Sequence, residues 1–456
     1  MSENTSGLYN RSPRWLQEAI LAGRTCVRNL LRENYQFRAA LEEVSRSQWL
    51  SAAELREYQT ERLASALRHA ATKVPYYQKL LGEYGLSDGR ISSPDDLSRL
   101  PLLTKQDVVK AGLALVARRA GLLRFKGTTS GSTGLSLTGY RDLRSIRYEN
   151  AFIARQLSWA GMRRGDRRAW IRGDMVVPAG QGCPPFWRLN RADNMLMLSS
   201  FHLSEAHSPA YIAALEHFDP VIIQAYPSSI AFLARYLDGS GRRYRGRSLK
   251  GIVTSSETLL ADQRHVIERA FGCRVFDWYG NYERAAAIGT CEHGSYHILS
   301  DYGVVELLAL EDGSKEIVGT GFFNSAMPLF RYRTGDAVIP TVDGTTCPCG
   351  RALPLVQQIV GRVDDYIRTP DGRYIGMMAI IFDWVNGLWE GQIVQEKINE
   401  LRIRVVPMGQ LTQEMKQDIE AKARSLTGPA MKIIVEAVEE IPRTARGKLR
   451  TVVSKL

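Results

Sequence analysis

The chain is organised around the stretch Lys126-Gly127-Thr128-Thr129-Ser130-Gly131-Ser132-Thr133-Gly134. Eight of these nine residues are glycines or carry a small hydroxylated side chain. Glycines let the backbone come close to a ligand, and successive free N–H groups in such a loop form a concave anion site. The stretch is not a Walker loop, because no Gly-Lys-Ser/Thr follows at the required spacing. We expect a loop that holds a polyphosphate; the alternative for this composition is an ordinary solvated loop.

Strands and helices are predicted to alternate after this loop. A helix at 141–161 and a strand at 168–172 come first, and an apolar run at 217–226 then enters Pro227-Ser228-Ser229 and a helix at 230–237. A strand at 251–257 is followed by a helix at 260–271 and a strand at 274–278. This alternation is typical of a largely parallel sheet covered by helices. Because ligands bind beyond the carboxyl ends of such strands, we expect the turns at 227–229, 255–257 and 279–281 at that edge.

The pattern changes twice toward the C-terminus. Between 296 and 339, short strands separated by glycines predict a β-rich subdomain. Beyond Gly361, strand-like stretches at 363–369, 401–406 and 432–436 and a helix at 412–426 predict a compact α+β unit. We therefore expect an α/β fold. Its large N-terminal domain, residues 1–363, would hold mixed parallel sheets and the β-rich subdomain, and residues 364–456 would form a small α+β domain.

The net charge of the 456 residues is +12. Arginines cluster at 163–168 and 242–247, which is typical of a surface for a polyanion or an anionic membrane. Solvated faces beside a site that handles phosphates would have the same composition. The clusters lack interleaved aromatic residues and no nucleic-acid module is recognisable, so we expect no nucleic-acid partner.

Amphipathic helices are predicted at 13–33 and 51–72. The first would pack on the protein's own core or on a partner subunit in a homodimer, or would lie at a membrane interface. No apolar run approaches the ~18–20 residues that span a bilayer. Residues 1–14 are polar and contain no apolar signal core. We therefore expect no transmembrane segment and a cytoplasmic location.

Five further stretches carry chemistry. Tyr279-Gly280-Asn281-Tyr282-Glu283 places an aromatic ring and a carboxylate on a glycine turn. Phe330-Arg331-Tyr332-Arg333-Thr334-Gly335-Asp336 ends in a carboxylate suited to a diol such as ribose. The others are Ser255-Ser256-Glu257, Gly361-Arg362-Val363-Asp364-Asp365 and Pro442-Arg443-Thr444-Ala445-Arg446-Gly447-Lys448-Leu449-Arg450. Each is a weak signal by itself, but their order and spacing together are specific.

This set resembles the adenylate-forming ligase superfamily, which includes acyl- and aryl-CoA synthetases. Within it, the chain is most similar to the phenylacetate–CoA ligase group and its capsular-polysaccharide-associated, CapK-like branch. The resemblance runs from about Trp49 to Lys448. It implies a large N-terminal domain, a small mobile C-terminal lid and an enzyme that forms AMP from ATP.

The resemblance also implies a role for each matching residue. Thr128, Thr129, Ser130, Gly131, Ser132, Thr133 and Gly134 would form the ATP phosphate loop. Ser256 and Glu257 would border the adenine, and Tyr279 would pack on it within the Gly280, Asn281 and Tyr282 turn. Glu283 would help to hold Mg²⁺, and Asp336 would bind the ribose with Arg362 nearby. Asp364 would be the hinge and Lys448 the catalytic lid lysine. Apart from the resemblance, candidates for the acid pocket lie in 150–230, among them Tyr226 and Pro227.

The physical chemistry of the reaction agrees with these roles. A carboxylate must attack the α-phosphorus of ATP while pyrophosphate leaves, so a fixed cation and Mg²⁺ are needed to offset the repulsion between the two anions. Lys448 is a flexible point charge that can span both groups. Two positions depart from the family pattern. Tyr282 stands where a small hydroxylated residue is usual, and Leu135-Ser136 replaces a common lysine and proline.

A metal site is predicted from a second set of residues. Cys291, Cys347 and Cys349 accompany His293 and His297, and three thiols with one imidazole are a ligand set of structural Zn²⁺. The resemblance selects His297 over His293. Four protein ligands would make the zinc structural and non-catalytic; unpaired buried thiols are the alternative.

We expect a two-step ligase that forms an acyl-adenylate from a carboxylic acid and ATP and transfers the acyl group to CoA. An amide ligase that transfers it to an amine, such as an amino acid or amino sugar, is a rival. A non-catalytic nucleotide-binding scaffold is a second rival, because the departures at Tyr282 and Leu135 favour it, whereas the retained Lys448 opposes it. The expected cofactors are ATP, Mg²⁺ and structural Zn²⁺.

Overall fold

The structure is a computed structural model that describes residues 9–32, 34–118, 124–128, 137–174, 176–178, 181–362, 367–370, 374–375, 378–382, 385–444 and 449–456. The chain divides into two compact units. Unit 1 comprises Met1–Val27, Ala160–Asp277 and Val360–Leu456, and unit 2 comprises Arg28–Trp159 and Trp278–Ile359. The predicted hinge, Asp364, lies outside the described residues, so the domain boundary at 363/364 stays a prediction.

Unit 1 contains the predicted parallel sheet. Its strands are β3 (Arg168–Arg172), β4 (Trp187–Asn190), β5 (Met195–Ser199), β6 (Ile222–Ala225), β7 (Gly251–Ser255) and β8 (Arg274–Gly280), of which unit 1 contains the residues up to Asp277. They lie in the order β8-β7-β6-β3-β5-β4, with β5, β3, β6 and β7 parallel and β4 antiparallel at the edge. The carboxyl ends of β3, β6 and β7 therefore meet at one edge of the sheet, as the alternating pattern predicts.

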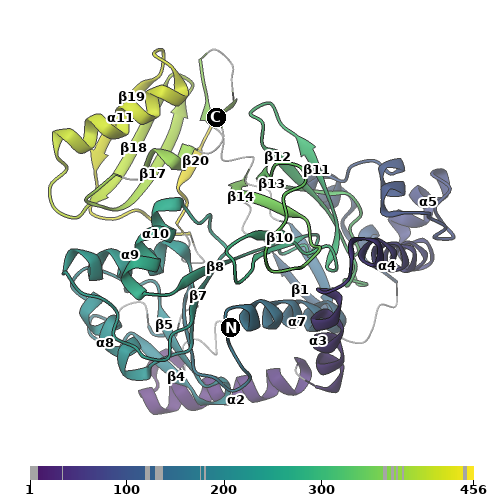
Figure 1. The fold of residues 1–456 in the computed structure, drawn as a ribbon, viewed down its shortest axis with the longest axis horizontal. Helices are drawn as coiled ribbons and strands as arrows, with labels where there is room; N and C mark the ends of the chain where they lie inside the picture. Colours follow the sequence, from purple (N-terminus) through teal and green to yellow (C-terminus); the bar gives the residue numbers. More distant parts are fainter. Residues whose placement is uncertain are drawn as a thin grey trace. The chain divides into compact units, whose positions relative to one another are not determined.

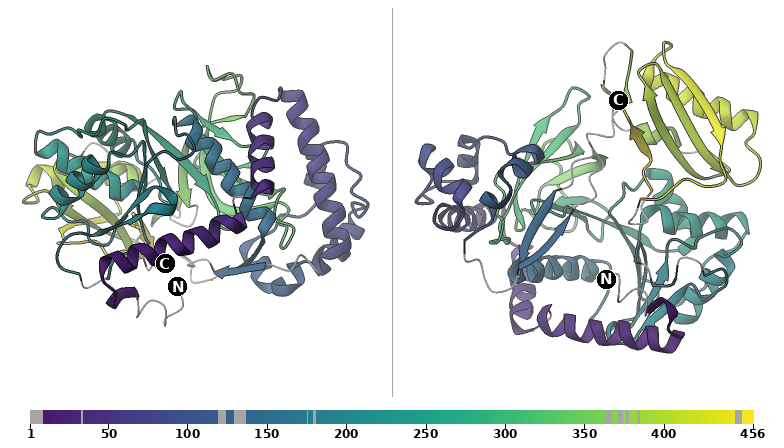
Figure 2. Two further views of the ribbon diagram at one scale, coloured as in Figure 1. Left: turned by 90° about the horizontal axis from the view of Figure 1, so that it is seen from below. Right: turned by 180° about the vertical axis from the view of Figure 1, so that it is seen from behind.

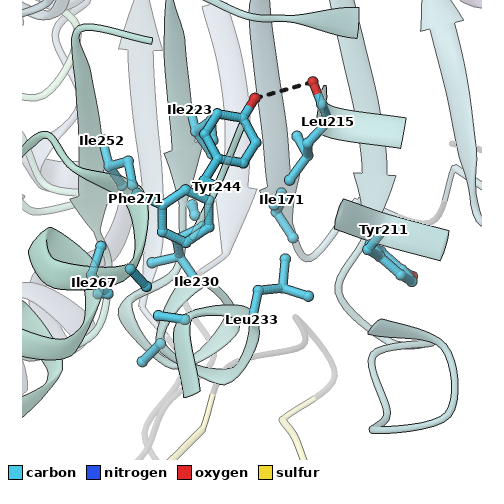
Figure 3. Close-up of a cluster of buried hydrophobic side chains, with 14 of the residues drawn as sticks. Ile171, Tyr211, Leu215, Ile223, Ile230, Leu233, Tyr244, Ile252, Ile267 and Phe271 are labelled. Atoms are coloured by element: carbon cyan, nitrogen blue, oxygen red, sulfur yellow. Dashed lines mark hydrogen bonds between the residues drawn. The ribbon is translucent and has the colours of Figure 1, made fainter. Parts of the chain in front are cut away.

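Three helices pack against this sheet: α8 (Ser208–Phe218), α9 (Pro227–Gly239) and α10 (Ala261–Phe271). Isoleucines of the strands, such as Ile171, Ile223 and Ile252, contact apolar side chains of α9 and α10 in one buried cluster (Figure 3). The Tyr244 hydroxyl, which would otherwise be buried without a partner, donates to the Leu215 carbonyl oxygen at 3.1 Å. This packing fixes the strand ends that carry the predicted site residues.

The C-terminal part of unit 1 is a four-stranded sheet with α11 (Gln413–Thr427) on one face (Figure 1). Its strands are β17 (Leu388–Lys397), β18 (Glu400–Pro407), β19 (Lys432–Ala437) and β20 (Val452–Ser454), in the order β19-β18-β17-β20. The central pair is an antiparallel hairpin and the two outer pairs are parallel. The short elements β15 (Ile367–Arg368), β16 (Tyr374–Ile375) and η5 (Met378–Phe382) precede it. The predicted α+β character is confirmed, although the sequence patterns did not predict β17 or β20.

The N-terminal helix α2 (Arg14–Arg32), purple in Figure 2, begins in unit 1, where Glu18 and Thr25 bond to β4. The 3-10 turn η3 (Arg191–Asp193) follows β4. The bounds of α2 agree with the predicted helix at 13–33. Within the described parts of the chain, no helix has both the length and the apolar character that crossing a membrane requires.

Unit 2 combines helices with a β-rich sheet. The helices are α3 (Tyr35–Ser47), α4 (Ala52–Lys73), α5 (Pro75–Glu83), η1 (Pro94–Arg99), α6 (Lys105–Ala111), η2 (Gly112–Leu115) and α7 (Leu143–Trp159). The sheet strands are β9 (Ala287–Thr290), β10 (Tyr296–Ile298), β11 (Gly303–Ala309), β12 (Lys315–Gly321), β13 (Tyr332–Pro340) and β14 (Leu355–Arg362), in the order β11-β12-β13-β14-β10-β9. This sheet is the predicted β-rich subdomain, so the expected α/β class with mixed sheets is confirmed.

A separate hairpin of β1 (Arg124–Thr128) and β2 (Thr138–Asp142) flanks the predicted phosphate loop. The helix predicted at 141–161 begins only at Leu143, because Asp142 ends β2 and its Oδ1 accepts the Ser145 N–H at 2.7 Å. Asp142 therefore caps α7. The prediction was wrong for the first two and the last two residues of that helix, because α7 ends at Trp159, and right for the rest.

One buried ion pair ties unit 2 together. Arg155 of α7 contacts Asp301 with Nη1 at 2.5 Å and Nη2 at 3.2 Å, and both side chains are fully buried. Arg155 Nη1 also donates to the Val44 carbonyl at 2.8 Å, and the Ser47 hydroxyl donates to Asp301. The pair thus links α3, α7 and the turn before β11.

Candidate active site

Glu257 lies where three segments of unit 1 meet. Its carboxylate follows β7 and accepts the N–H of Ser228, in the first turn of α9, at 3.0 Å. It also accepts the N–H of Leu449 at 2.8 Å. Burial raises the pKa of Glu257, while the Ser228 and Leu449 hydrogen bonds and the charge of Arg443 act in the opposite direction. A residue predicted to border adenine is therefore joined to the segment that carries the predicted catalytic lysine.

Ser256 and Arg172 shape the same edge of the sheet. Ser256 has a φ of +74°, a left-handed conformation that is unusual for a serine. Arg172, the last residue of β3, donates to the Ser256 hydroxyl, and its guanidinium lies 5.1 Å from the centre of the Tyr226 ring. Burial lowers the pKa of Arg172. Sequence reasoning missed Arg172; its position at the end of a predicted strand was the available signal.

The C-terminal sheet contacts α9 through Trp389. The Trp389 ring stacks on Phe232 with ring centres 4.5 Å apart. Arg235 donates to the Trp389 carbonyl at 2.5 Å and to Asp262 of α10 at 2.7 Å. Arg443 forms an ion pair with Glu390. These contacts join the C-terminal sheet to α9, on the side where Leu449 bonds to Glu257.

Arg362 follows Gly361, whose φ is +103°. A Cβ at Gly361 would lie 2.5 Å from the Thr258 hydroxyl oxygen, so only glycine fits this close approach to the turn after Glu257. Gly361, with Arg362 next to it in the chain, is thus brought to the turn that carries Ser256 and Glu257. Lys448 and Asp364 lie outside the described residues.

Tyr279 and Asp336 form a hydrogen-bonded pair in unit 2. The Tyr279 hydroxyl donates to Asp336 Oδ2 at 2.8 Å, and the Asp336 N–H donates to the Thr334 hydroxyl at 3.1 Å. Burial, together with the charge of Asp336, raises the pKa of Tyr279 well above its ordinary value. The phenol therefore remains a donor, and the structure brings together the residues predicted for adenine and for ribose.

The Tyr282 ring packs on the β1–β2 hairpin at the end next to the predicted phosphate loop. Gly127 and Gly139 are cross-strand partners. A Cβ on Gly127 would lie 2.1 Å from the Tyr282 hydroxyl oxygen, and a Cβ on Gly139 would lie 2.6 Å from the ring. The Arg141 guanidinium lies 3.6 Å from the ring centre, a cation–π contact. The tyrosine that departs from the family pattern therefore packs on both strands that enter the predicted phosphate loop.

Thr128 is the last residue of β1 and pairs with Thr138. The remaining predicted loop residues, Thr129, Ser130, Gly131, Ser132, Thr133 and Gly134, lie outside the described residues.

The turn at 280–283 is packed tightly. A Cβ on Gly280 would lie 2.9 Å from Trp278 Nε1, and Asn281 Oδ1 accepts the Ala285 N–H at 2.9 Å. The Glu283 carboxylate accepts the Tyr332 hydroxyl at 3.3 Å. The predicted Mg²⁺ ligand therefore has one protein partner among those described and retains acceptor capacity for others.

Arg284 was not predicted as part of this turn. Its φ is +61°, and its side chain forms an ion pair with Glu149 of α7, which also accepts the Tyr302 hydroxyl at 2.8 Å. Burial acts to lower the pKa of Arg284, but Glu149 and Tyr302 raise it overall. The left-handed backbone and the buried pair fix the turn that carries Tyr282 and Glu283.

The four predicted metal ligands also meet in unit 2. One ligand atom from each of Cys291, His297, Cys347 and Cys349 lies within 4.8 Å of every other. Cys291 Sγ and Cys347 Sγ are 3.6 Å apart, and Cys349 Sγ is 3.4 Å from His297 Nε2. Tetrahedral zinc with bonds of ~2.0–2.3 Å requires separations of roughly 3.5–3.8 Å between its ligand atoms. The donor set and its spacing therefore fit structural zinc.

His297 is oriented for this role. Its Nδ1 lies 3.1 Å from the Leu353 carbonyl oxygen, which makes Nδ1 the protonated nitrogen and leaves the Nε2 lone pair for a metal. Burial lowers the pKa of His297, so the ring is neutral. His293 contributes a backbone N–H to Cys291 Sγ at 3.4 Å, and its ring is not part of the cluster of described ligand atoms.

Comparisons with known proteins agree with the expected resemblance. Residues 367–455 match the family model of the CapK C-terminal domain. Protein CapK of Staphylococcus aureus is 25% identical over 98% of this chain and 99% of its own length. A phenylacetate-coenzyme A ligase of Thermus thermophilus is 26% identical over 70% of this chain and 72% of its own length. The chain is thus homologous to proteins that are CoA ligases, which are AMP-forming enzymes.

The fold is that of the CoA ligases. The crystal structure of 2-hydroxyisobutyryl-CoA ligase in the postadenylation state in complex with R3-HIB-AMP matches with a TM-score of 0.70 and 21% identity over 90% of this chain and 92% of that one. The same ligase in an open conformation with 2-HIB-AMP and CoA matches with a TM-score of 0.56. This chain and 2-hydroxyisobutyryl-CoA ligase share the large α/β domain with mixed sheets and the small C-terminal domain.

Proposed function

We propose that this chain, whose fold is that of the CoA ligases, is an ATP-dependent acid–CoA ligase. It would convert a carboxylic acid and ATP into an acyl-adenylate and pyrophosphate, and then pass the acyl group to the thiol of CoA with release of AMP. The hydrogen bond from the Leu449 N–H to Glu257 carries the proposal. It supports a C-terminal segment that delivers Lys448 to the nucleotide.

The described residues suit the separate tasks of this reaction. Ser256 and Glu257 would border the adenine from the sheet edge of unit 1. In unit 2, Asp336 would accept the ribose hydroxyls beside Tyr279, which already donates to it. Glu283 would help to hold Mg²⁺, which offsets the charge of the phosphates when bound.

Lys448 would offset the repulsion between the attacking carboxylate and the α-phosphate, because both carry negative charge. In this proposal the second step follows movement of the C-terminal domain about Asp364. That movement would break the contacts of Trp389 with Phe232 and Arg235, and the Glu257–Leu449 hydrogen bond.

Pyrophosphate exchange tests the first step directly. With a panel of aryl, acyl and amino acids, at least one acid should support exchange of labelled pyrophosphate into ATP. Lys448→Ala should abolish exchange while nucleotide binding persists, and Lys397→Ala, which removes an exposed lysine of the same domain, should not. Exchange that survives Lys448→Ala removes this lysine from the mechanism. No exchange with any acid favours the non-catalytic scaffold.

An amide ligase is the second candidate. The match to the phenylacetate-coenzyme A ligase covers 70% of this chain, so the acyl acceptor is the part of the proposal that needs a direct test. Trapping the adenylate with CoA or with amino acids and amino sugars separates the two. A thioester product supports the first proposal, and an amide product in the absence of a thioester supports the second.

A further inference from the structure

Helix α2 is attached to unit 1 through its polar side. Gln17 is 2% exposed and Thr25 is 4% exposed, and both face the edge strand β4. Arg188 Nε donates to Gln17 Oε1 at 2.5 Å, and Asn190 Nδ2 donates to the Thr25 hydroxyl at 2.9 Å. A helix of a globular protein usually buries its apolar side and exposes its polar side. In the described part of α2, the two buried side chains are polar, whereas Leu16, Ile20 and Leu21 are half-buried.

The opposite side of α2 is apolar and exposed. Trp15 is 69% exposed and Val27 is 60% exposed, and Ala19 and Cys26 are exposed as well. Residues 15, 19 and 26 share one face at helical spacing, and Leu30, 77% exposed, continues it. Over about 18 Å of helix, large apolar side chains thus face away from the residues that hold α2. Clustered exposure of this kind marks an interaction surface.

The charges of α2 indicate its partner. The helix carries four arginines, at 14, 24, 28 and 32, and one glutamate. Glu18 is already engaged, because it accepts from Arg14 Nε at 2.9 Å and from the Leu189 N–H at 3.2 Å. Arg14 and Arg24 are exposed, as is Arg11 just before the helix. A second copy would oppose arginines to arginines, whereas anionic lipid head groups complement them.

We propose that α2 is an interfacial membrane anchor that lies in the plane of an anionic lipid surface. Trp15 and Val27 enter the boundary between head groups and acyl chains, where tryptophan is favoured. The arginines stay at the level of the phosphates. The polar bonds to β4 keep the apolar side outward, so the helix needs no rearrangement before it binds.

Sedimentation with lipid vesicles tests the anchor. The chain should bind vesicles of phosphatidylcholine with a quarter phosphatidylglycerol, should bind pure phosphatidylcholine more weakly, and should lose binding as salt rises. The double variant Trp15→Gln/Val27→Gln should bind at least about tenfold more weakly, because it removes the two apolar side chains that enter the bilayer boundary.

The matched control is Leu113→Gln/Val342→Gln, two side chains that are 70% and 83% exposed outside α2. It should bind like the original chain, and thermal unfolding should show that both double variants remain folded. Equal binding by the two double variants overturns the anchor, as does equal binding to both lipids. In another outcome, the chain self-associates as its concentration rises, binds no vesicles, and loses this self-association in Trp15→Gln/Val27→Gln. That result identifies a second copy of the chain as the partner of α2 and also overturns the membrane anchor.

Discussion

Gly139→Ala should destabilise unit 2 because the new methyl group collides with Tyr282. The added Cβ would lie 2.6 Å from Tyr282 Cε1, and ordinary contact begins near 3.4 Å. The ring must therefore retreat by about 0.8 Å from a position that it shares with Gly127 and with the Arg141 guanidinium. Overpacking of this kind costs roughly 1–3 kcal/mol. For a folded unit of this size, that lowers the melting temperature by about 2–12 °C.

A double-mutant cycle isolates the collision. In a Tyr282→Ala background the ring is gone, so Gly139→Ala should become neutral or slightly stabilising, since alanine is entropically favoured over glycine within a strand. Melting curves of the four proteins give the coupling. Gly182→Ala is the control, because its new Cβ would meet no described atom within 4 Å. If Gly139→Ala lowers the melting temperature equally with and without the tyrosine ring, Tyr282 does not pack on the hairpin as described.

Asp301→Asn should lower the stability of unit 2 by about 3–5 kcal/mol, because it leaves the fully buried Arg155 guanidinium without its counter-ion; a melting shift no larger than that of an exposed Asp→Asn change would contradict this. Burial raises the pKa of Glu257, so the folded state holds this proton more tightly than the unfolded one. Stability should then decline as pH rises from the ordinary value of Glu257 to the raised one; in Glu257→Gln this decline should be weaker in thermal scans, and an unchanged slope would rule the residue out as its source. Purified protein should contain about one zinc per chain, and Cys347→Ser should reduce the metal content and lower the melting temperature; elemental analysis that finds the same zinc in both proteins would refute the site.

Local patterns were sufficient for much of the fold. Apolar runs predicted β6 and β7 and the helices after them, because a parallel strand buried on both faces reads as a continuous apolar run. The α+β character of the C-terminal residues was equally visible. β20 could not be predicted in this way, because it is three residues long and depends on parallel pairing with β17, more than fifty residues earlier.

The candidate site, like the fold, could be predicted only where the residues carry a local signal. The sequence predicted the metal ligands Cys291, His297, Cys347 and Cys349. Three cysteines and a histidine are a typical zinc ligand set, and the resemblance favoured His297 over His293. The contact of Glu257 with Leu449 could not be predicted, since it joins residues 192 positions apart. From the sequence, Tyr282 indicates only that a small hydroxylated residue is missing. The structure shows that its ring packs on Gly127 and Gly139.

The pairing of β20 with β17 makes the last residues of the chain important for holding the segment before them, although their sequence does not indicate this. The Lys448 segment is tethered upstream by the Arg443–Glu390 ion pair and downstream by the Thr451 carbonyl, which accepts the Ile393 N–H at 2.8 Å. Clipping off the final strand would remove the Thr451 tether, whereas the hydrogen bonds of Leu449 with Glu257 and of the Arg450 carbonyl with Gln392 would remain. If the proposed role of Lys448 is right, a chain trimmed after Arg450 should lose part of its pyrophosphate exchange, although every residue proposed for catalysis would still be present.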